Sequence, residues 1–266
     1  MSAPSMSDPQ VRFSDGASYE RMMGEWSRLA GEQFLAWFAP PSNAEWLDVG
    51  CGSGAFTSLA IERCAPGAIL GVDPSPSQLE FARARGLGPR VRFEQGDAML
   101  SQVADGAVDV TVAALVLHFL PDPLASVREM ARVTRSGGIV GAYVWDPDHG
   151  GFPYDALLRE MAGVGIPVAT PPSTHVCEPG ELSRLWNVAG LTDVATYRIE
   201  VMRQYASFEA YWDAAVASPR TARSIREAPA EAVAELRARL AAVLPRGVDG
   251  VIMPRARANA VRGRVA

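Results

Sequence analysis

The sequence predicts a doubly wound α/β fold with a mostly parallel sheet. Short apolar runs alternate with amphipathic segments at helical spacing, which is typical of strand and helix units covered on both faces. Acidic residues end three successive apolar runs, at Asp48, Asp73 and Asp97. A glycine-rich turn, GCGSG, follows the first of these runs.

The predicted elements follow one another along the first half of the chain. The strands are AEWLDV (44–49), AILGVD (68–73), RVRFEQGD (90–97), VDVTVAALVLHFL (108–120) and GGIVGAYVW (137–145). The helices between them are SGAFTSLAIERC (53–64), SPSQLEFARARG (75–86) and DPLASVREMARVT (122–134). Ser75 and Ser77 are both candidate N-caps of the second helix, and Gly86 is its expected stop.

The amino-acid composition limits the classes of protein to which this chain can belong. The chain has 266 residues, of which 48% are hydrophobic and 21% charged, which suits one large globular domain. No segment approaches the roughly 20 apolar residues of a membrane span. Residues 1–17 have no apolar signal-peptide core and are expected to form a flexible leader. A soluble, cytoplasmic protein with no membrane partner is therefore expected.

Charge and cysteine content exclude other classes. The net charge of −5 gives no basic face for a nucleic acid, and the arginine cluster at 255–264 is interpreted as a solvated strand face. Cys51, Cys64 and Cys177 have neither the even number nor the spacing of a disulfide framework or a structural zinc site.

The three acids are spaced by one strand and helix unit each. Ligands of doubly wound sheets bind outside the carboxyl ends of the strands, so Asp48, Asp73 and Asp97 should converge on one crevice. Each alone could be a helix cap. Three in phase indicate a ligand site.

The glycine turn has two interpretations. Gly50, Gly52 and Ala55 fit the dinucleotide pattern G-x-G-x-x-G/A, and Asp73 lies near the distance expected for a ribose-binding acid. Asp48, however, would repel a pyrophosphate in a partly desolvated cleft. S-adenosylmethionine carries an α-ammonium and a sulfonium and no phosphate, so the same carboxylate would favour it.

At these residues the sequence resembles the class I S-adenosylmethionine-dependent methyltransferases, in the small-molecule branch similar to ubiquinone/menaquinone-biosynthesis methyltransferases. The resemblance covers about residues 19–200 and includes LDVGCGSG, GVDPSPSQLEFAR, EQGDAM and AALVLHFLPDP in order. It implies a Rossmann-like, seven-stranded sheet in which 194–205 and 250–261 pair antiparallel at the edge.

The resemblance also implies a set of cofactor-binding residues. Asp73 would bind the ribose hydroxyls, Asp97 and the Ala98 N–H the adenine, and Ala113–Leu115 the methionyl group. The residues expected to bind the cofactor are Tyr19, Met23, Trp26, Ser27, Asp48, Gly50, Cys51, Gly52, Asp73, Pro74, Ser75, Asp97, Ala98, Ala113, Ala114 and Leu115. The first four belong to a helix expected to close over the cofactor; the alternative is a plain amphipathic helix packed on the sheet.

His118 is the candidate catalytic base, because it lies at the carboxyl end of the fourth strand and an ordinary histidine titrates near neutrality. A structural or pocket-shaping role is the alternative. Asp146, Asp148 and His149 could hold a metal or act as a base, but a turn with Asx caps is the favoured interpretation, so no metal is expected.

Two insertions, 147–180 and 207–246, are expected to cover the active site and to determine which acceptor binds. Aromatic residues there could line a pocket or fill core: Trp145, Phe152, Tyr154, Tyr211 and Trp212.

The expected organisation is one methyltransferase domain over 18–266, with a lid helix at 18–40 and a cofactor-binding core at 44–146. The expected function is methyl transfer from S-adenosylmethionine to an unidentified small-molecule acceptor, which releases S-adenosylhomocysteine. The alternatives are a non-catalytic S-adenosylmethionine-binding sensor or accessory protein and, less favoured, an NAD(P)-dependent oxidoreductase. The oligomeric state stays open.

Overall fold

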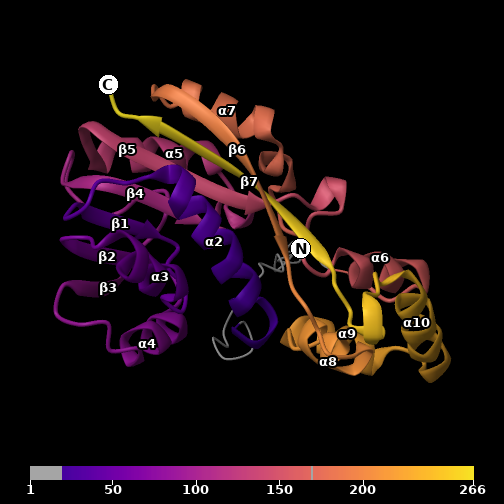
Figure 1. Cartoon of the computed structure of the whole chain (residues 1–266). Helices are drawn as coiled ribbons and strands as arrows, with labels where there is room; N and C mark the ends of the chain where they lie inside the picture. Colours follow the sequence, from indigo (N-terminus) through magenta and orange to yellow (C-terminus); the bar gives the residue numbers. More distant parts are fainter. Residues whose placement is uncertain (1–19, 169) are drawn as a thin grey trace, which may run out of the picture.

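A computed structural model describes residues 20–168 and 170–266. Within these residues seven strands form one sheet in the order β3-β2-β1-β4-β5-β7-β6 (Figure 1). The strands are β1 (Glu45–Val49), β2 (Ala68–Asp73), β3 (Val91–Gln95), β4 (Val108–Ala114), β5 (Thr134–Trp145), β6 (Thr192–Met202) and β7 (Arg255–Arg264). The predicted mostly parallel sheet is confirmed.

The last two strands pair antiparallel, as predicted. β7 lies second from the edge and runs antiparallel to both β5 and β6. β6 therefore forms the edge and runs parallel to β5, so its carboxyl end faces the same way as those of β1–β5. This direction matters because ligands of such sheets bind outside the carboxyl ends.

The fourth strand is shorter than predicted. The expected strand over 108–120 ends at Ala114, and a 3₁₀ turn follows at Leu117–Phe119. The cause is local, because Leu115 has a positive φ of 61° and its N–H donates to the Tyr143 carbonyl 2.8 Å away. A residue in this conformation cannot continue a strand. His118 is thereby placed on a tight turn above the sheet.

Helices cover both faces of the sheet. α2 (Glu25–Phe38), α3 (Ala55–Cys64) and α4 (Pro76–Ala84) lie on one face, and α5 (Pro123–Val133) and α7 (Pro179–Val188) on the other. Ser75 was one of the two predicted N-caps, whereas Asp122 was not predicted as a cap. Ser75 Oγ accepts from the Gln78 N–H at the start of α4, and Asp122 Oδ1 accepts from the Ala125 N–H at the start of α5.

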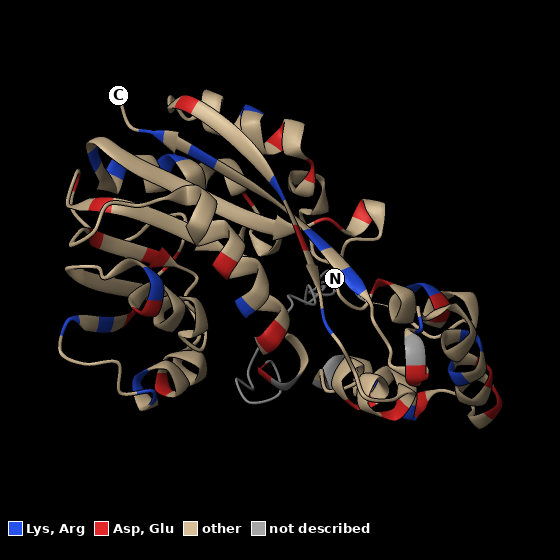
Figure 2. Ribbon diagram, viewed as in Figure 1, with Lys and Arg blue, Asp and Glu red and all other residues tan. Residues whose placement is uncertain are grey.

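The prediction of a solvated arginine face over 255–264, in β7, is only partly correct, because Arg257, Arg262 and Arg264 make contacts within the fold while Arg255 is exposed. Figure 2 shows them spaced along this strand. Arg262 Nη1 donates to the Trp37 carbonyl 2.7 Å away, at the end of α2, and its guanidinium lies 4.7 Å from the centre of the Trp37 ring. A cation at this place stabilises the negative end of the helix dipole. Arg257 Nε pairs with Asp146 Oδ2 at 2.7 Å.

Four further helices form a lobe beyond the carboxyl ends of β5 and β6 (Figure 1). They are α6 (Asp155–Gly163), α8 (Phe208–Ala215), α9 (Pro219–Glu227) and α10 (Ala230–Val243). Buried residues of the lobe, among them Leu157, Tyr211 and Leu240, belong to the same apolar core as Trp26 and Phe34 of α2. In the described ranges no helix combines the length and the apolar character needed to cross a membrane.

Candidate functional site

The glycine turn after β1 is held by the neighbouring strand. The N–H groups of Gly50 and Cys51 both donate to the Val72 carbonyl, at 2.8 and 3.0 Å. Gly50 has a φ of 68°, and a Cβ there would lie 2.6 Å from Val116 Cγ2. At Gly52, with a φ of 51°, a Cβ would meet no other atom of the described chain within 4 Å. The turn is therefore closely packed against Val116 at Gly50, whereas the space beside Gly52 is open and lets a ligand approach the backbone.

Asp73, at the end of β2, fixes this turn. Its Oδ2 accepts from the Gly52 N–H at 3.0 Å and its Oδ1 from the Ser75 N–H at 2.8 Å. Burial raises the pKa of Asp73, although the two backbone hydrogen bonds act in the opposite direction. Each carboxylate oxygen retains further acceptor capacity, which ligand hydroxyls could use. Pro74 lies beside Gln95, whose Nε2 donates to its carbonyl.

Asp48 is a buried acid under the turn, with 1% of its surface exposed. Thr57 Oγ1 donates to its Oδ2 at 2.5 Å, while Oδ1 is buried and has no hydrogen-bond partner in the described structure. Burial, opposed by the Thr57 bond and reinforced by the charge of Asp73, raises the pKa of Asp48 to about 7. An ionised Asp48 would be stabilised by a nearby positive charge.

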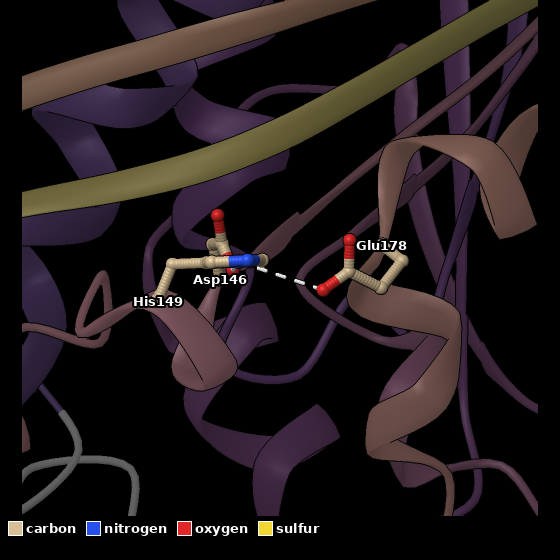
Figure 3. Close-up of side chains that lie close together, drawn as sticks. All are labelled: Asp146, His149 and Glu178. Atoms are coloured by element: carbon tan, nitrogen blue, oxygen red, sulfur yellow. Dashed lines mark hydrogen bonds and ion pairs between the residues drawn. The ribbon is translucent and has the colours of Figure 1, made fainter.

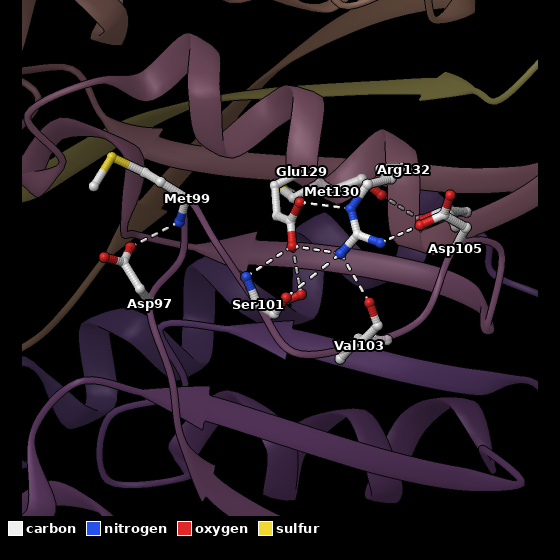
Figure 4. Close-up of polar contacts among 9 residues, drawn as sticks. Asp97, Met99, Ser101, Val103, Asp105, Glu129, Met130 and Arg132 are labelled. Carbon is white, nitrogen blue, oxygen red and sulfur yellow. Dashed lines mark hydrogen bonds and ion pairs between the residues drawn. The ribbon is translucent and has the colours of Figure 1, made fainter.

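The loop after β3 carries Asp97, shown in Figure 4, and Ala98, which follows it in the sequence. Asp97 Oδ1 accepts from the Met99 N–H at 2.8 Å, and Ala98 is buried. The loop is anchored to α5 through Glu129, whose Oε1 accepts from both the N–H and the Oγ of Ser101 at 2.7 Å.

Arg132 completes this anchor. It donates to both Glu129 oxygens and to the Val103 carbonyl, and pairs with Asp105. The Arg132 guanidinium lowers the pKa of Glu129, so the anchor stays ionised at neutral pH. No local pattern indicates the ion pair between Arg132 and Asp105, which joins α5 to a loop 27 residues earlier in the chain.

The end of β4 lies next to the glycine turn. Ala113 and Leu115 are buried and Ala114 is partly exposed. His118 is 7% exposed, and within residues 20–168 and 170–266 its Nδ1 is buried without a hydrogen-bond partner. Burial lowers the pKa of His118 to about 4. The ring is therefore neutral at pH 7 and a weaker base than an ordinary histidine.

The predicted lid begins with a π-helical turn, Glu20–Gly24, and continues as α2. Tyr19 lies outside the described residues. Met23 and Trp26 are buried, and Ser27 is partly buried. Trp26 Nε1 donates to Tyr205 Oη at 2.9 Å, so its polar atom is used within the protein.

Glu20 is a residue of this segment that sequence analysis missed. Its Oε1 accepts from Ser53 Oγ of the glycine turn at 2.7 Å and also from Arg85. Arg85 Nε in turn donates to the Ser53 carbonyl. These contacts join three distant parts of the chain, so local spacing could not reveal them.

Three tyrosines meet between the N-terminal segment and the lobe. Tyr154 donates to the Met22 carbonyl at 2.6 Å and shares a hydrogen bond with Tyr205 Oη at 3.0 Å. The Tyr211 ring lies 5.2 Å from that of Tyr205 and 5.7 Å from that of Tyr154. Of the predicted aromatic set, Tyr154 and Tyr211 thus come together with Phe152 nearby, while Trp212 contacts Phe208. Tyr205 was not among the predicted residues.

The segment after β5 brings Asp146, His149 and Glu178 together (Figure 3). His149 Nδ1 lies 2.9 Å from Asp146 Oδ1 and 3.5 Å from Glu178 Oε1. The Asp146 carboxylate raises the pKa of His149. Arg257 forms an ion pair with the other carboxylate oxygen of Asp146, so the guanidinium already offsets negative charge in this cluster.

The arrangement suits a ligand that has polar hydroxyl and amino groups and a positive centre. Comparison with known proteins identifies this ligand. A family model described as a methyltransferase domain matches residues 47–141. The chain is 30% identical over 248 residues to trans-aconitate 2-methyltransferase of Methylobacterium nodulans, covering 90% of this chain and 94% of that protein.

A second relative, trans-aconitate 2-methyltransferase of Methylobacterium radiotolerans, is 31% identical over 70% of each chain. Among solved structures, phosphoethanolamine N-methyltransferase 2 of Haemonchus contortus in complex with S-adenosyl-L-methionine has the same fold. Its TM-score is 0.57 at 14% identity, over 94% of this chain and 56% of that one. The family resemblance and the cofactor predicted from the sequence are confirmed: the chain belongs to the class I S-adenosylmethionine-dependent methyltransferases.

Proposed function

We propose that the protein transfers the methyl group of S-adenosylmethionine to a carboxylate oxygen of a small di- or tricarboxylic acid, and that trans-aconitate is the first acceptor to test. The observation that carries this proposal is the similarity, over almost the whole of both chains, to a protein named trans-aconitate 2-methyltransferase. Aconitate is a tricarboxylate, and its carboxylate oxygens are its nucleophilic heteroatoms.

The residues of the site are chemically suited to the cofactor. Asp73 would accept from the ribose hydroxyls, and Asp97 with the Ala98 N–H would bind the adenine. The open backbone at Gly52 leaves room for the ligand, and the buried, unused Oδ1 of Asp48 would face its positive end through the turn of Gly50 and Cys51. When bound, the cofactor supplies an electrophilic methyl group, so the protein's share is alignment and the exclusion of water.

The burial of His118 agrees with a carboxylate acceptor. A carboxylate is already ionised at neutral pH and has no proton to lose before it attacks a methyl group. A hydroxyl acceptor would need a base, and a histidine whose pKa is about 4 is a poor one near pH 7. For a carboxylate acceptor, His118 would shape the site and keep water from the reacting atoms.

The first test is turnover with trans-aconitate. Incubation with S-adenosylmethionine should release S-adenosylhomocysteine in proportion to a monomethyl ester of the acid, both measured by mass spectrometry. The matched control is trimethyl aconitate, which has no free carboxylate and should give no release. Absence of turnover with aconitate and with a panel of di- and tricarboxylic acids would rule out this acceptor class.

The second test concerns His118. In the His118→Ala variant kcat with the acid acceptor should fall less than about 10-fold, because no proton is removed, whereas loss of a true base costs about 10²- to 10⁴-fold. Steady-state kinetics against His175→Ala, an exposed histidine, separates the two. A loss of the larger size would restore His118 as the base.

The third test uses the raised pKa of Asp48. An ionised Asp48 favours the ammonium of S-adenosylhomocysteine, and the protein must lose a proton near pH 7 to provide it. Affinity should therefore rise by about tenfold from pH 6 to pH 8, since one pKa unit corresponds to a factor of ten. Calorimetric titration of the Asp48→Asn variant should show a flat profile over this range. An equal slope in both proteins would assign the pH dependence to another group, such as Asp73.

A further inference from the structure

We propose that Arg203 and Tyr211 bind a carboxylate of the acceptor that is not methylated, and thereby select polycarboxylic acids. The inference deepens the proposed function and rests on it for the identity of the ligand. It starts from two buried hydrogen-bond donors, Arg203 Nη1 and the Tyr211 hydroxyl, that have no partner within residues 20–168 and 170–266.

Arg203 lies beyond the carboxyl ends of the parallel strands, on the side of the sheet where ligands bind. It follows β6 directly, and the register places Ile199 of β6 and Trp145, the last residue of β5, opposite the same residue of β7, Ala258. Arg203 is four residues further on, or about 13 Å beyond the end of β5 at the usual rise of a strand. There the chain runs toward the helical lobe (Figure 1).

The guanidinium of Arg203 is largely withdrawn from water, with 16% of the side chain exposed. It lies 4.5 Å from the centre of the Tyr205 ring, and Nε forms an ion pair with Glu25 Oε2 at 2.6 Å. Nη1 is buried and finds no hydrogen-bond partner in the part of the chain that the structure describes. Because Glu25 is 54% exposed, its charge is well screened, and the guanidinium keeps capacity for a second anion.

Tyr211 of α8 is the second unused donor. Its side chain is fully buried, and its hydroxyl has no partner among the described residues. Of the two tyrosines that pack against it, Tyr154 donates to the Met22 carbonyl and Tyr205 accepts from Trp26 Nε1, and their two hydroxyls share a hydrogen bond. The Arg203 side chain also interacts with the Tyr205 hydroxyl, which leaves its buried Nη1 without a partner among the described residues. Burial raises the pKa of Tyr211, so its hydroxyl keeps its proton and can donate.

Both unused donors thus lie next to one ring, that of Tyr205. Buried donors without partners are rare in folded proteins because each costs the desolvation of a polar group. A carboxylate satisfies both kinds of donor: it accepts strongly from a guanidinium, and its oxygens also accept from a phenol.

The position of the cluster favours the acceptor over the cofactor. β6 is four strands from β1, or about 19 Å at the usual strand spacing. The N-terminal segment links the two regions, because Glu20 contacts Ser53 of the glycine turn while Glu25 and Trp26 contact Arg203 and Tyr205. The six residue steps from Glu20 to Trp26 span about 9 Å of helix. A small polycarboxylate could therefore reach from the cluster toward the methyl group.

The test compares Arg203→Gln and Tyr211→Phe with two exposed residues of β6, Arg198→Gln and Tyr197→Phe. Arg203→Gln should raise KM for trans-aconitate by about 10- to 100-fold and Tyr211→Phe by about tenfold, with smaller changes in kcat, because a charged hydrogen bond to the acceptor is lost. The β6 controls should match the wild type.

Two further readouts exclude a structural role. Tyr211→Phe removes a hydroxyl that has no partner in the described chain, so its melting temperature should not fall. The affinity of both variants for S-adenosylhomocysteine, measured by calorimetry, should be unchanged. Reduced cofactor affinity would place Arg203 at the cofactor instead and overturn the inference, as would unchanged KM in both variants.

Direct titration separates failure of the inference from failure of the proposed function. Trans-aconitate and a panel of di- and tricarboxylic acids are titrated into protein saturated with S-adenosylhomocysteine. If the wild type binds an acid without methylating it and Arg203→Gln does not bind that acid, the carboxylate-binding role of Arg203 is supported and the proposed methyl transfer to this acid is refuted. If the wild type binds no acid of the panel, the inference itself is wrong.

Discussion

The site depends on the attachment of the glycine turn to β2. The N–H groups of Gly50 and Cys51 share the Val72 carbonyl, and the Gly52 N–H is taken by the Asp73 carboxylate. These bonds fold the backbone sharply back over the end of β1, which only a glycine with a positive φ and no Cβ can do beside Val116. The glycine turn therefore fixes the position of Asp48 relative to Asp73. It also determines which backbone groups face a ligand.

The electrostatics of the turn follow from this geometry. Two carboxylates are held close together, both are partly or fully withdrawn from water, and burial raises the pKa of each. A phosphate added here would increase the repulsion, whereas a ligand with an ammonium and a sulfonium would reduce it. The repulsion of phosphate by the two carboxylates explains why this chain, whose glycine turn fits a dinucleotide-binding pattern, is a methyltransferase. The same repulsion disfavours the oxidoreductase interpretation.

Much of the fold could be predicted from the sequence because its signals are local. The apolar runs, the Ser75 cap and the acids at strand ends lie within single strand and helix units, and β2 has the predicted bounds. The end of β4 was missed, since only the bond from Leu115 to Tyr143 shows why the strand stops. Periodicity alone could not reveal that contact.

The missed residues of the site share one property: their partners are distant in the sequence. Glu20 meets Ser53 and Arg85, Tyr205 meets Trp26 across 179 positions, and Glu178 joins His149. Arg203 and Tyr205 lay at the end of a predicted strand, where nothing local marks a buried cation over a ring. Such pairs are set by how elements that are distant in the sequence pack together.

Calorimetric titration of the folded protein with S-adenosylhomocysteine and, in parallel, with NAD⁺ tests whether the carboxylates at the glycine turn select the cofactor. We expect saturable binding of S-adenosylhomocysteine, loss of that binding in a folded Asp73→Ala variant, and no binding of NAD⁺. Binding of NAD⁺ without binding of S-adenosylhomocysteine would contradict this expectation, because the carboxylates at the glycine turn would then tolerate the phosphates they are expected to repel.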